Sequence, residues 1–330
     1  MIPLNSSPWE PRVWRTELTR AIRSSAELLQ YVDVNLTDAA DLPTFPTLVP
    51  RGYAARMRKG DPADPLLLQV LGREEETREV PGFEFDPLQE VDGRQHVNPA
   101  AGLLHKYRGR ALLITTGACA VNCRYCFRRH FPYGAQRDLD SAVDAIAADS
   151  SIKEIILSGG DPLLLDDPAL GELLDTLANI PHVTRLRLHT RIPIVLPERT
   201  TAALLAMLAT KRFKVAVVVH ANHAAELTED TARAFACLHG SGAQLFNQAV
   251  LLRGINDSVA VQVALAERLY EQSVLPYYLH MPDRVAGTHH FAVDEDDARA
   301  LHRAMQSELP GYLVPRLVRE EPGAPAKSLI

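Results

Sequence analysis

Residues 117–127 read GACAVNCRYCF and place Cys119, Cys123 and Cys126 in the spacing C-x3-C-x2-C, directly after the apolar run ALLITT at residues 111–116. Such a run predicts a buried strand, with the cysteines together on the loop that follows it. Thiolates are ligands of zinc or of iron–sulfur clusters. Zinc sites commonly use paired cysteine spacings, and no second pair is present. The motif therefore favours an iron–sulfur cluster held by three cysteines, with one iron left open.

The rest of the composition narrows the class of protein. The chain has 330 residues, a net charge of −6 and four cysteines. This charge gives no sign of nucleic-acid or membrane-surface binding, and no apolar run reaches the roughly 20 residues of a membrane span. Three of four cysteines in one motif do not make a disulfide framework. The fourth, Cys237, lies in a predicted helix, where a lone cysteine is most often a packing residue. We expect a soluble, cytoplasmic protein.

From residue 111 onward, short apolar runs alternate with amphipathic stretches. This alternation predicts βα units around a parallel sheet. Six units are too few for a closed eight-stranded barrel, so the expected fold is α/β, a partial, open (β/α)6 barrel with its functional face at the carboxyl ends of the strands. The predicted strands are Ala111–Thr116, Glu154–Leu157, Arg185–His189, Val215–Val219, Gln244–Leu251 and Tyr277–His280, and the predicted helices are Leu139–Ala148, Pro168–Ala178, Glu198–Leu208, Thr228–His239, Val259–Gln272 and Asp294–Leu309.

The two ends of the chain have a different character. Trp14–Tyr31 has helical periodicity, and Glu74–Asn98 is polar and rich in Pro and Gly, which predicts a long connecting arm. Near the other end, Tyr312–Val318 resembles a strand. We therefore divide the chain into a mainly helical N-terminal extension with its arm (1–105), the barrel core (106–310) and a short C-terminal segment (311–330).

Polar residues follow several of the predicted strands. The run SGGDP begins at Ser158, and its glycines, Gly159 and Gly160, allow the backbone either to approach a ligand or to form a tight turn. Asn247 and Gln248 form a polar pair inside a strand and need partners, which a ligand or the core could provide. His220 ends another strand.

The cysteine spacing, with an aromatic residue before the last cysteine, resembles the signature of the radical S-adenosylmethionine (SAM) superfamily. The resemblance implies a [4Fe–4S] cluster whose open iron binds SAM, and SGGDP is similar to the superfamily's GGD/GGE element. The implied SAM contacts are Tyr125, Ser158, Gly159, Gly160, Asp161, His220 and Gln248.

A more specific resemblance covers roughly residues 45–330. It rests on the runs HKYRGRALL, CAVNCRYCFRRHF, LSGGDPL, RIPIVLP, NQAVLLRGIND, PYYLH with MPD, and the terminal P-x4-K, which are similar to those of the lysine 2,3-aminomutases. The chain ends soon after that lysine, as in the shorter bacterial branch. That branch isomerises (S)-α-lysine to (R)-β-lysine, which a separate ligase attaches to elongation factor P (EF-P). The resemblance thus implies an isomerase, with lysine as substrate and a functional link to EF-P and its lysyl ligase.

Members of this family bind pyridoxal 5′-phosphate (PLP) covalently through a lysine near the C-terminus. The resemblance implies that Lys327, in the run PGAPAKS, is this catalytic lysine. GAPA stands in place of the family's glycine-rich approach, and Ser328 in place of the usual threonine. Basic side chains neutralise phosphate, and the resemblance places Lys106, Arg110 and Arg191 there, although the family more often has arginine at the first of these.

The resemblance also implies contacts for the amino acid substrate. Arg128 would bind the carboxylate, a task for which a guanidinium is suited, with Arg129 behind it. Asp283 and Glu320 would face the ε-ammonium, and Glu320 stands where the family has the shorter aspartate. The two acids disfavour glutamate as the substrate but leave arginine, or lysine for another pathway, as alternatives. A non-catalytic metal-binding module is an alternative of a different class, which metal analysis would separate.

Overall fold

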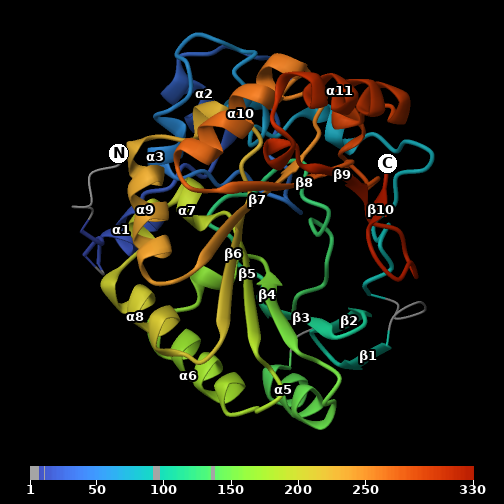
Figure 1. Ribbon diagram of the computed structural model, residues 1–330. Helices are drawn as coiled ribbons and strands as arrows, with labels where there is room; N and C mark the ends of the chain where they lie inside the picture. Colours follow the sequence, from blue (N-terminus) through green and yellow to red (C-terminus); the bar gives the residue numbers. More distant parts are fainter. Residues whose placement is uncertain (1–6, 11, 92–96, 135–137) are drawn as a thin grey trace.

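The computed structural model describes residues 7–10, 12–91, 97–134 and 138–330. Its strands form one sheet in which they follow one another in chain order (Figure 1). Strands β3 to β9 run parallel, while β1, β2 and β10 add antiparallel edges. The strands are β1 (Val97–Ala100), β2 (Leu103–Tyr107), β3 (Arg110–Thr116), β4 (Glu154–Gly159), β5 (Arg185–Thr190), β6 (Lys214–Val219), β7 (Gln244–Val250), β8 (Leu275–His280), β9 (Arg316–Arg319) and β10 (Ser328–Leu329).

Helices connect the parallel strands and lie along the outer side of the curved sheet (Figure 1). These are α5 (Leu139–Ala148), α6 (Asp167–Ala178), α7 (Ile192–Val195), α8 (Ala202–Thr210), α9 (Glu229–Gly240), α10 (Val259–Glu271) and α11 (Glu295–Glu308). The linear strand order and these crossovers confirm the prediction of a partial, open barrel. The N-terminal helices are α1 (Val13–Thr19), α2 (Ser25–Val32), α3 (Arg51–Ala54) and α4 (Pro65–Leu68).

One hydrophobic core runs through both parts of the molecule. The middle of β4 is buried on both faces, as expected for a parallel strand covered by helices. Side chains of the N-terminal region, including Trp14, Leu28 and Tyr53, belong to the same core as Leu157 and Leu317 of the barrel. The N-terminal helices therefore pack as part of the barrel's core, and the three-part division of the chain stays a prediction. Among the described residues, no helix combines the length and apolar character that crossing a bilayer requires.

Some predicted elements differ from the structure at identifiable breaks. Trp14–Tyr31 forms two helices, because the hydroxyl of Ser24 accepts a hydrogen bond from Glu27 N at 3.1 Å and caps α2. Glu198–Leu208 is likewise divided, into a 3-10 turn and α8, which begins after Thr201. At the C-terminal end, the expected strand starts only at Arg316, after Pro315, since a proline cannot donate to the ladder.

The predicted connecting arm forms part of the barrel's interior wall. Its described part, up to Val91, lies beside the loop after β8, where Glu84 N donates to Arg284 O at 2.9 Å and Ala286 N donates to Glu84 O at 2.8 Å. Leu88 and Glu90 are buried there. Residues 92–96 of the expected arm lie outside the described residues. The segment therefore contributes buried side chains to the barrel wall in addition to connecting two parts of the chain.

Candidate active site

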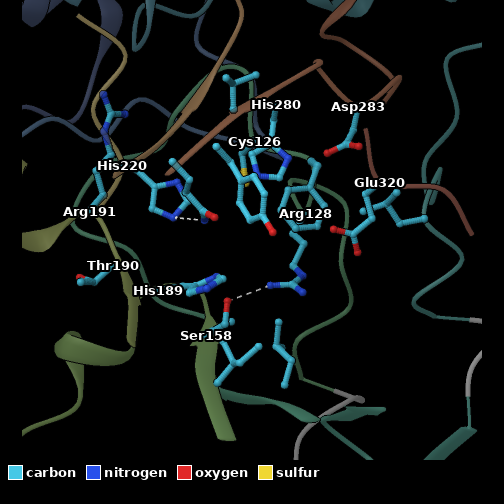
Figure 2. A pocket seen from close by; sticks show the side chains of 18 of the residues that line it. Cys126, Arg128, Ser158, His189, Thr190, Arg191, His220, His280, Asp283 and Glu320 are labelled. Atoms are coloured by element: carbon cyan, nitrogen blue, oxygen red, sulfur yellow. Dashed lines mark hydrogen bonds between the residues drawn. The ribbon is translucent and has the colours of Figure 1, made fainter. Parts of the chain in front are cut away.

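A cavity of about 540 Å³ lies at the carboxyl ends of the parallel strands. Figure 2 shows side chains from β4, β5, β6 and β8 turned towards it, including Ser158, His189, His220 and His280. All the residues that the sequence assigned to a cofactor or substrate line this one cavity: Lys106, Arg110, Cys119, Cys123, Tyr125, Cys126, Arg128, Ser158, Gly159, Gly160, Asp161, Arg191, His220, Gln248, Asp283, Glu320 and Lys327.

The three cysteines lie on the loop that leaves β3. Their thiols are free, and burial together with the neighbouring thiols raises the pKa of Cys119 and raises that of Cys126 to about 11. Such thiols stay protonated at neutral pH until a bound cation displaces the protons. Within the described chain, no three His, Cys, Asp or Glu side chains converge closely enough to hold a single metal ion. The three thiols on one loop are a donor set that fits an iron–sulfur cluster.

The glycines of SGGDP bring this turn against the cysteine loop. A Cβ on Gly159 would lie 2.4 Å from Thr116 O, and one on Gly160 would lie 2.2 Å from Ala118 O. Gly160 N donates to Thr116 O at 2.6 Å. The glycines are required for this close packing of two loops, and both also line the cavity. Contact with SAM stays a prediction for this turn.

Asp161 holds the same turn to the end of β5. Its carboxylate accepts hydrogen bonds from Thr190 Oγ1 at 2.7 Å, from Arg191 N at 2.7 Å and from Leu163 N at 3.1 Å. Burial raises the pKa of Asp161 to about 6 even though these bonds favour the charged form. Its contacts thus make it a residue that shapes the turn.

Arg191 lies beside the cysteine loop. Its Nη1 donates to Cys123 Sγ at 2.7 Å, and its Nη2 donates to Glu226 Oε2 and to Gln69 Oε1, both at 2.8 Å. Lys106, by contrast, is bound to Glu90 and Glu320. The three basic residues expected around a phosphate are therefore divided between two places, and the contacts of Arg191 favour a role at the cysteine loop.

The polar residues in β7 and directly after β6 lie in two environments, the hydrophobic core and the cavity. Asn247 forms two hydrogen bonds with the backbone of Ala221, at 2.8 and 3.0 Å, and belongs to the core. Gln248 Nε2 lies 2.7 Å from His220 Nε2 in the cavity (Figure 2). Because an amide nitrogen only donates, His220 Nε2 accepts and is unprotonated. Burial agrees with this, since it lowers the pKa of His220 to about 3.

Nε of Arg191 is buried with no hydrogen-bond partner among the described residues, and so are two polar atoms of other residues in the cavity wall: the hydroxyl of Tyr125 and Nε2 of His189. A buried polar atom of this kind requires a partner that the protein itself does not provide. Both residues therefore fit a cavity that binds a polar ligand. Tyr125 was predicted as a SAM contact, whereas His189 was not predicted to belong to the site.

Arg128 and Arg129 point to different carboxylates. Arg128 Nε donates to Glu90 Oε2 at 2.6 Å, and its Nη1 donates to Ser158 Oγ at 3.1 Å (Figure 2). Arg129 is buried behind the cysteine loop, where its Nη2 donates to Glu76 Oε2 at 2.7 Å. Only Arg128 lines the cavity, and its contact with the substrate carboxylate stays a prediction.

Lys327 lies among charged side chains of the cavity wall. Its ammonium forms an ion pair with Glu320, whose other carboxylate oxygen lies 2.9 Å from Lys106 Nζ. Burial opposes the charge on Glu320, but Lys327 and Lys106 outweigh it and hold the pKa of this carboxyl below its usual range. Asp283 differs: burial, with the nearby Glu320, raises its pKa to about 7. Of the two acids expected to face the ε-ammonium, Glu320 is therefore firmly ionised, whereas Asp283 accepts a proton near neutral pH.

Glu90 and Glu226 are the clearest omissions from the sequence-based site. Each is a buried carboxylate that holds a predicted basic residue, Arg128 or Arg191. Neither lies in a motif or at a strand end that would have distinguished it from the chain's other glutamates. Only the folded arrangement brings Glu90 into the cavity wall and Glu226 against Arg191, which lines the cavity.

Comparisons with known proteins agree with this arrangement. A model of the Radical SAM superfamily matches residues 113–260. The L-lysine 2,3-aminomutase of Escherichia coli (strain K12) is 44% identical over 324 residues, covering 96% of this chain and 93% of that protein. The L-lysine 2,3-aminomutase of Haemophilus influenzae is 42% identical, covering 97% and 96%, and that of Clostridium subterminale is 33% identical, covering 96% and 77%. These matches confirm the predicted enzyme class. The chain belongs to the lysine 2,3-aminomutase family of radical SAM enzymes.

Proposed function

We propose that this chain converts (S)-α-lysine to (R)-β-lysine with a [4Fe–4S] cluster, SAM and PLP, and that the product serves the β-lysylation of EF-P. One observation carries the proposal: the three-cysteine loop, Arg128, the acids Asp283 and Glu320, and Lys327 all face a single cavity. A cation and two acids in one cavity suit an amino acid that has a carboxylate and a second amino group.

The cysteine loop fits the cluster, and the residues around it fit SAM. Cys119, Cys123 and Cys126 would hold three irons and leave the fourth for SAM. The SGGDP turn and the His220–Gln248 pair are predicted SAM contacts, and Tyr125, on the cysteine loop itself, contributes a buried hydroxyl that requires a partner. When bound, the cluster and SAM supply the one-electron chemistry that removes a hydrogen atom from an unactivated carbon.

The other side of the cavity fits PLP. Lys327 is about four-fifths buried, and Lys106 and Arg110 line the same cavity as cationic groups for the phosphate. The guanidinium of Arg110 lies 4.6 Å from the ring centre of Tyr107, which holds it in place. When bound, PLP supplies the electron-withdrawing group that lets nitrogen migrate between neighbouring carbons.

The remaining tasks fall to the protein's own charged side chains. Arg128 would bind the substrate carboxylate through charge-assisted hydrogen bonds. Asp283 would bind the ε-ammonium, and the positive charge of that group would lower the pKa of Asp283 from about 7. Glu320 forms an ion pair with Lys327 and so positions this amine in the cavity. Together these contacts fix both ends of a lysine, which is the positioning that hydrogen transfer at one chosen carbon requires.

Turnover by the reconstituted protein tests the proposal. Anaerobic protein with SAM, PLP and a reductant should convert L-lysine to (R)-β-lysine, identified by chiral chromatography, and should leave L-arginine unchanged. Iron and sulfide analysis should find about four of each per chain. If protein with full iron, sulfide and PLP content forms no β-lysine, lysine is refuted as the substrate. Turnover of arginine instead would favour the alternative aminomutase. A single zinc in place of iron would refute the hypothesis of a radical SAM enzyme and favour a non-catalytic metal-binding module.

The link to EF-P needs its own experiment. The purified product, supplied with ATP and a lysyl ligase that acts on EF-P, should add to EF-P the mass of one β-lysyl group. The same ligase should use it in preference to α-lysine. A ligase that favours α-lysine would remove EF-P from the proposal and leave the aminomutase activity in place.

A further inference from the structure

Glu90 occupies the cavity wall at the end of the described part of the arm. It is 3% exposed and lines the cavity. The backbone around it is held in place, since the carboxylate of Asp86 accepts hydrogen bonds from Glu90 N and Val91 N, both at 2.9 Å. Gln89 has a φ of 53°, in the left-handed region that few residues other than glycine adopt. The arm therefore presents this carboxylate through a constrained turn.

Glu90 is bound to two cations of the site. Its Oε2 accepts from Arg128 Nε at 2.6 Å, and its Oε1 accepts from Arg128 Nη2 at 2.9 Å and lies 2.7 Å from Lys106 Nζ. Burial opposes the charge on Glu90, but Arg128 and Lys106 outweigh it, and the pKa of this carboxyl lies below its usual range. Glu90 is thus an ionised group with short, charge-assisted bonds.

The contacts of Arg128 leave a defined part of its guanidinium available. A guanidinium has five N–H donors in a rigid plane. Within the described chain, Glu90 takes the Nε–Nη2 edge and Ser158 takes one donor of Nη1. One donor on each Nη atom is left for a further ligand such as a second carboxylate. Glu90 therefore sets the plane in which Arg128 can receive a ligand.

Glu90 is also the first anion in a row of alternating charges that begins at Arg128. The order of the row is Arg128, Glu90, Lys106, Glu320 and Lys327, and each residue forms an ion pair with the next. This row joins the residue predicted for the substrate carboxylate to the residues predicted for PLP. Because each anion lies between two cations, removing the charge of Glu90 leaves Arg128 without its carboxylate partner and leaves Lys106 with Glu320 alone.

We propose that Glu90 is a positioning residue for the substrate: it holds Arg128 by one edge, so that the other edge meets the carboxylate of lysine. The inference rests on the proposed function, because it takes Arg128 as the partner of that carboxylate. The effect of Glu90 acts through Arg128. Its loss should therefore weaken ligands that have a carboxylate and spare ligands that lack one.

Binding of two ligands tests this role. Protein loaded with its cluster and PLP, but without SAM, is titrated with L-lysine and with cadaverine, which is lysine without the carboxylate. Glu90→Gln should weaken L-lysine binding about tenfold and change cadaverine binding less than about twofold. Glu90→Asp keeps the charge but is one methylene shorter, so its loss for L-lysine should be smaller. Glu79→Gln removes an exposed glutamate of the same arm and should match wild type.

The two ligands distinguish the outcomes. Equal loss for both, or no loss for either, would overturn the role of Glu90, since an effect through Arg128 must depend on the carboxylate. Failure of the wild-type protein to bind L-lysine would refute the proposed function, and this inference with it. Iron and PLP content verify that each variant is folded. If Glu90→Gln does not fold, the same comparison of ligands is made with Glu90→Asp.

Discussion

Lys106 Nζ lies 2.9 Å from Glu320 Oε1, so two residues that depart from the usual family pattern contact each other. The family resemblance has arginine more often at the first position and aspartate at the second. Glu320, one methylene longer than aspartate, reaches Lys106 with one oxygen and Lys327 with the other. The two departures are thus one combined change in the cavity, in which a longer acid meets the compact ammonium of a lysine.

The pair predicts a double-mutant cycle. Glu320→Asp shortens the acid and should leave a cation without its partner, lowering the free energy of unfolding by about 1–2 kcal/mol. Lys106→Arg, introduced into the same protein, extends the cation and should recover part of this loss. Denaturant unfolding of the four proteins, free of PLP and lysine, measures the coupling, which should be at least about 0.5 kcal/mol. Strictly additive effects would show that the contact is not energetically significant.

Removing the amine of Lys327 should abolish the covalent attachment of PLP and leave the [4Fe–4S] cluster in place. Lys327→Ala should lose the visible absorbance of lysine-bound PLP and keep the brown colour and iron content of the cluster, because the cysteines lie on a different loop. Lys153→Ala, at an exposed lysine, is the matched control and should keep both signals. Retention of the PLP absorbance in Lys327→Ala would place the cofactor on another residue.

Asp283 predicts a dependence of stability on pH. Its pKa is about 7 in the folded protein and about 3.9 in an unfolded chain. The folded state therefore binds the proton more tightly, and the stability that this proton contributes is lost as pH rises from about 4 to 7. In protein without lysine and PLP, Asp283→Asn should raise the thermal midpoint relative to wild type at pH 8 more than at pH 4.5. Asp144→Asn, at an exposed position, should show no such difference, and an equal effect of Asp283→Asn at both pH values would contradict the shifted pKa.

The buried pair of Arg124 and Glu76 should be important for folding. Both side chains are fully buried, and Glu76 also binds Arg129. Glu76→Gln would leave two buried guanidinium groups without a full counter-charge, which should lower the free energy of unfolding by about 3–5 kcal/mol. The neighbouring exchange Glu75→Gln should change it by less than about 0.5 kcal/mol. A small effect of Glu76→Gln would mean that water or another group compensates the charge.

Local patterns predicted the elements whose signal lies within one segment. The apolar runs of β3 to β8 and the amphipathic stretches of α5, α6, α9, α10 and α11 have the periods of buried strands and surface helices, and they occur close to the predicted bounds. The hairpin β1–β2 was missed because β1 contains Pro99 and few apolar residues. Strand β10 spans two residues, too few for any periodic signal.

The composition of the cavity could be predicted, but the pairing of its side chains could not. Every residue that the sequence assigned to the cluster, SAM, PLP or the substrate lines the cavity, and Arg129, expected behind Arg128, does not. Their partners come from distant segments: Tyr53 and Gln69 reach Arg191 from the N-terminal region, and Glu90 reaches Arg128 from the arm. Such contacts depend on tertiary packing, for which the local sequence around each glutamate or tyrosine has no distinguishing pattern.

Migration of nitrogen from Cα to Cβ is the central claim, and isotopic labelling tests it directly. Anaerobic protein with its cluster, SAM, PLP and a reductant is given L-lysine labelled with ¹⁵N at the α-amino group. NMR of the product should show the ¹⁵N bonded to Cβ, with the ε-nitrogen unlabelled. Label that stays on Cα, or that is released as ammonia, would contradict a 2,3-aminomutase.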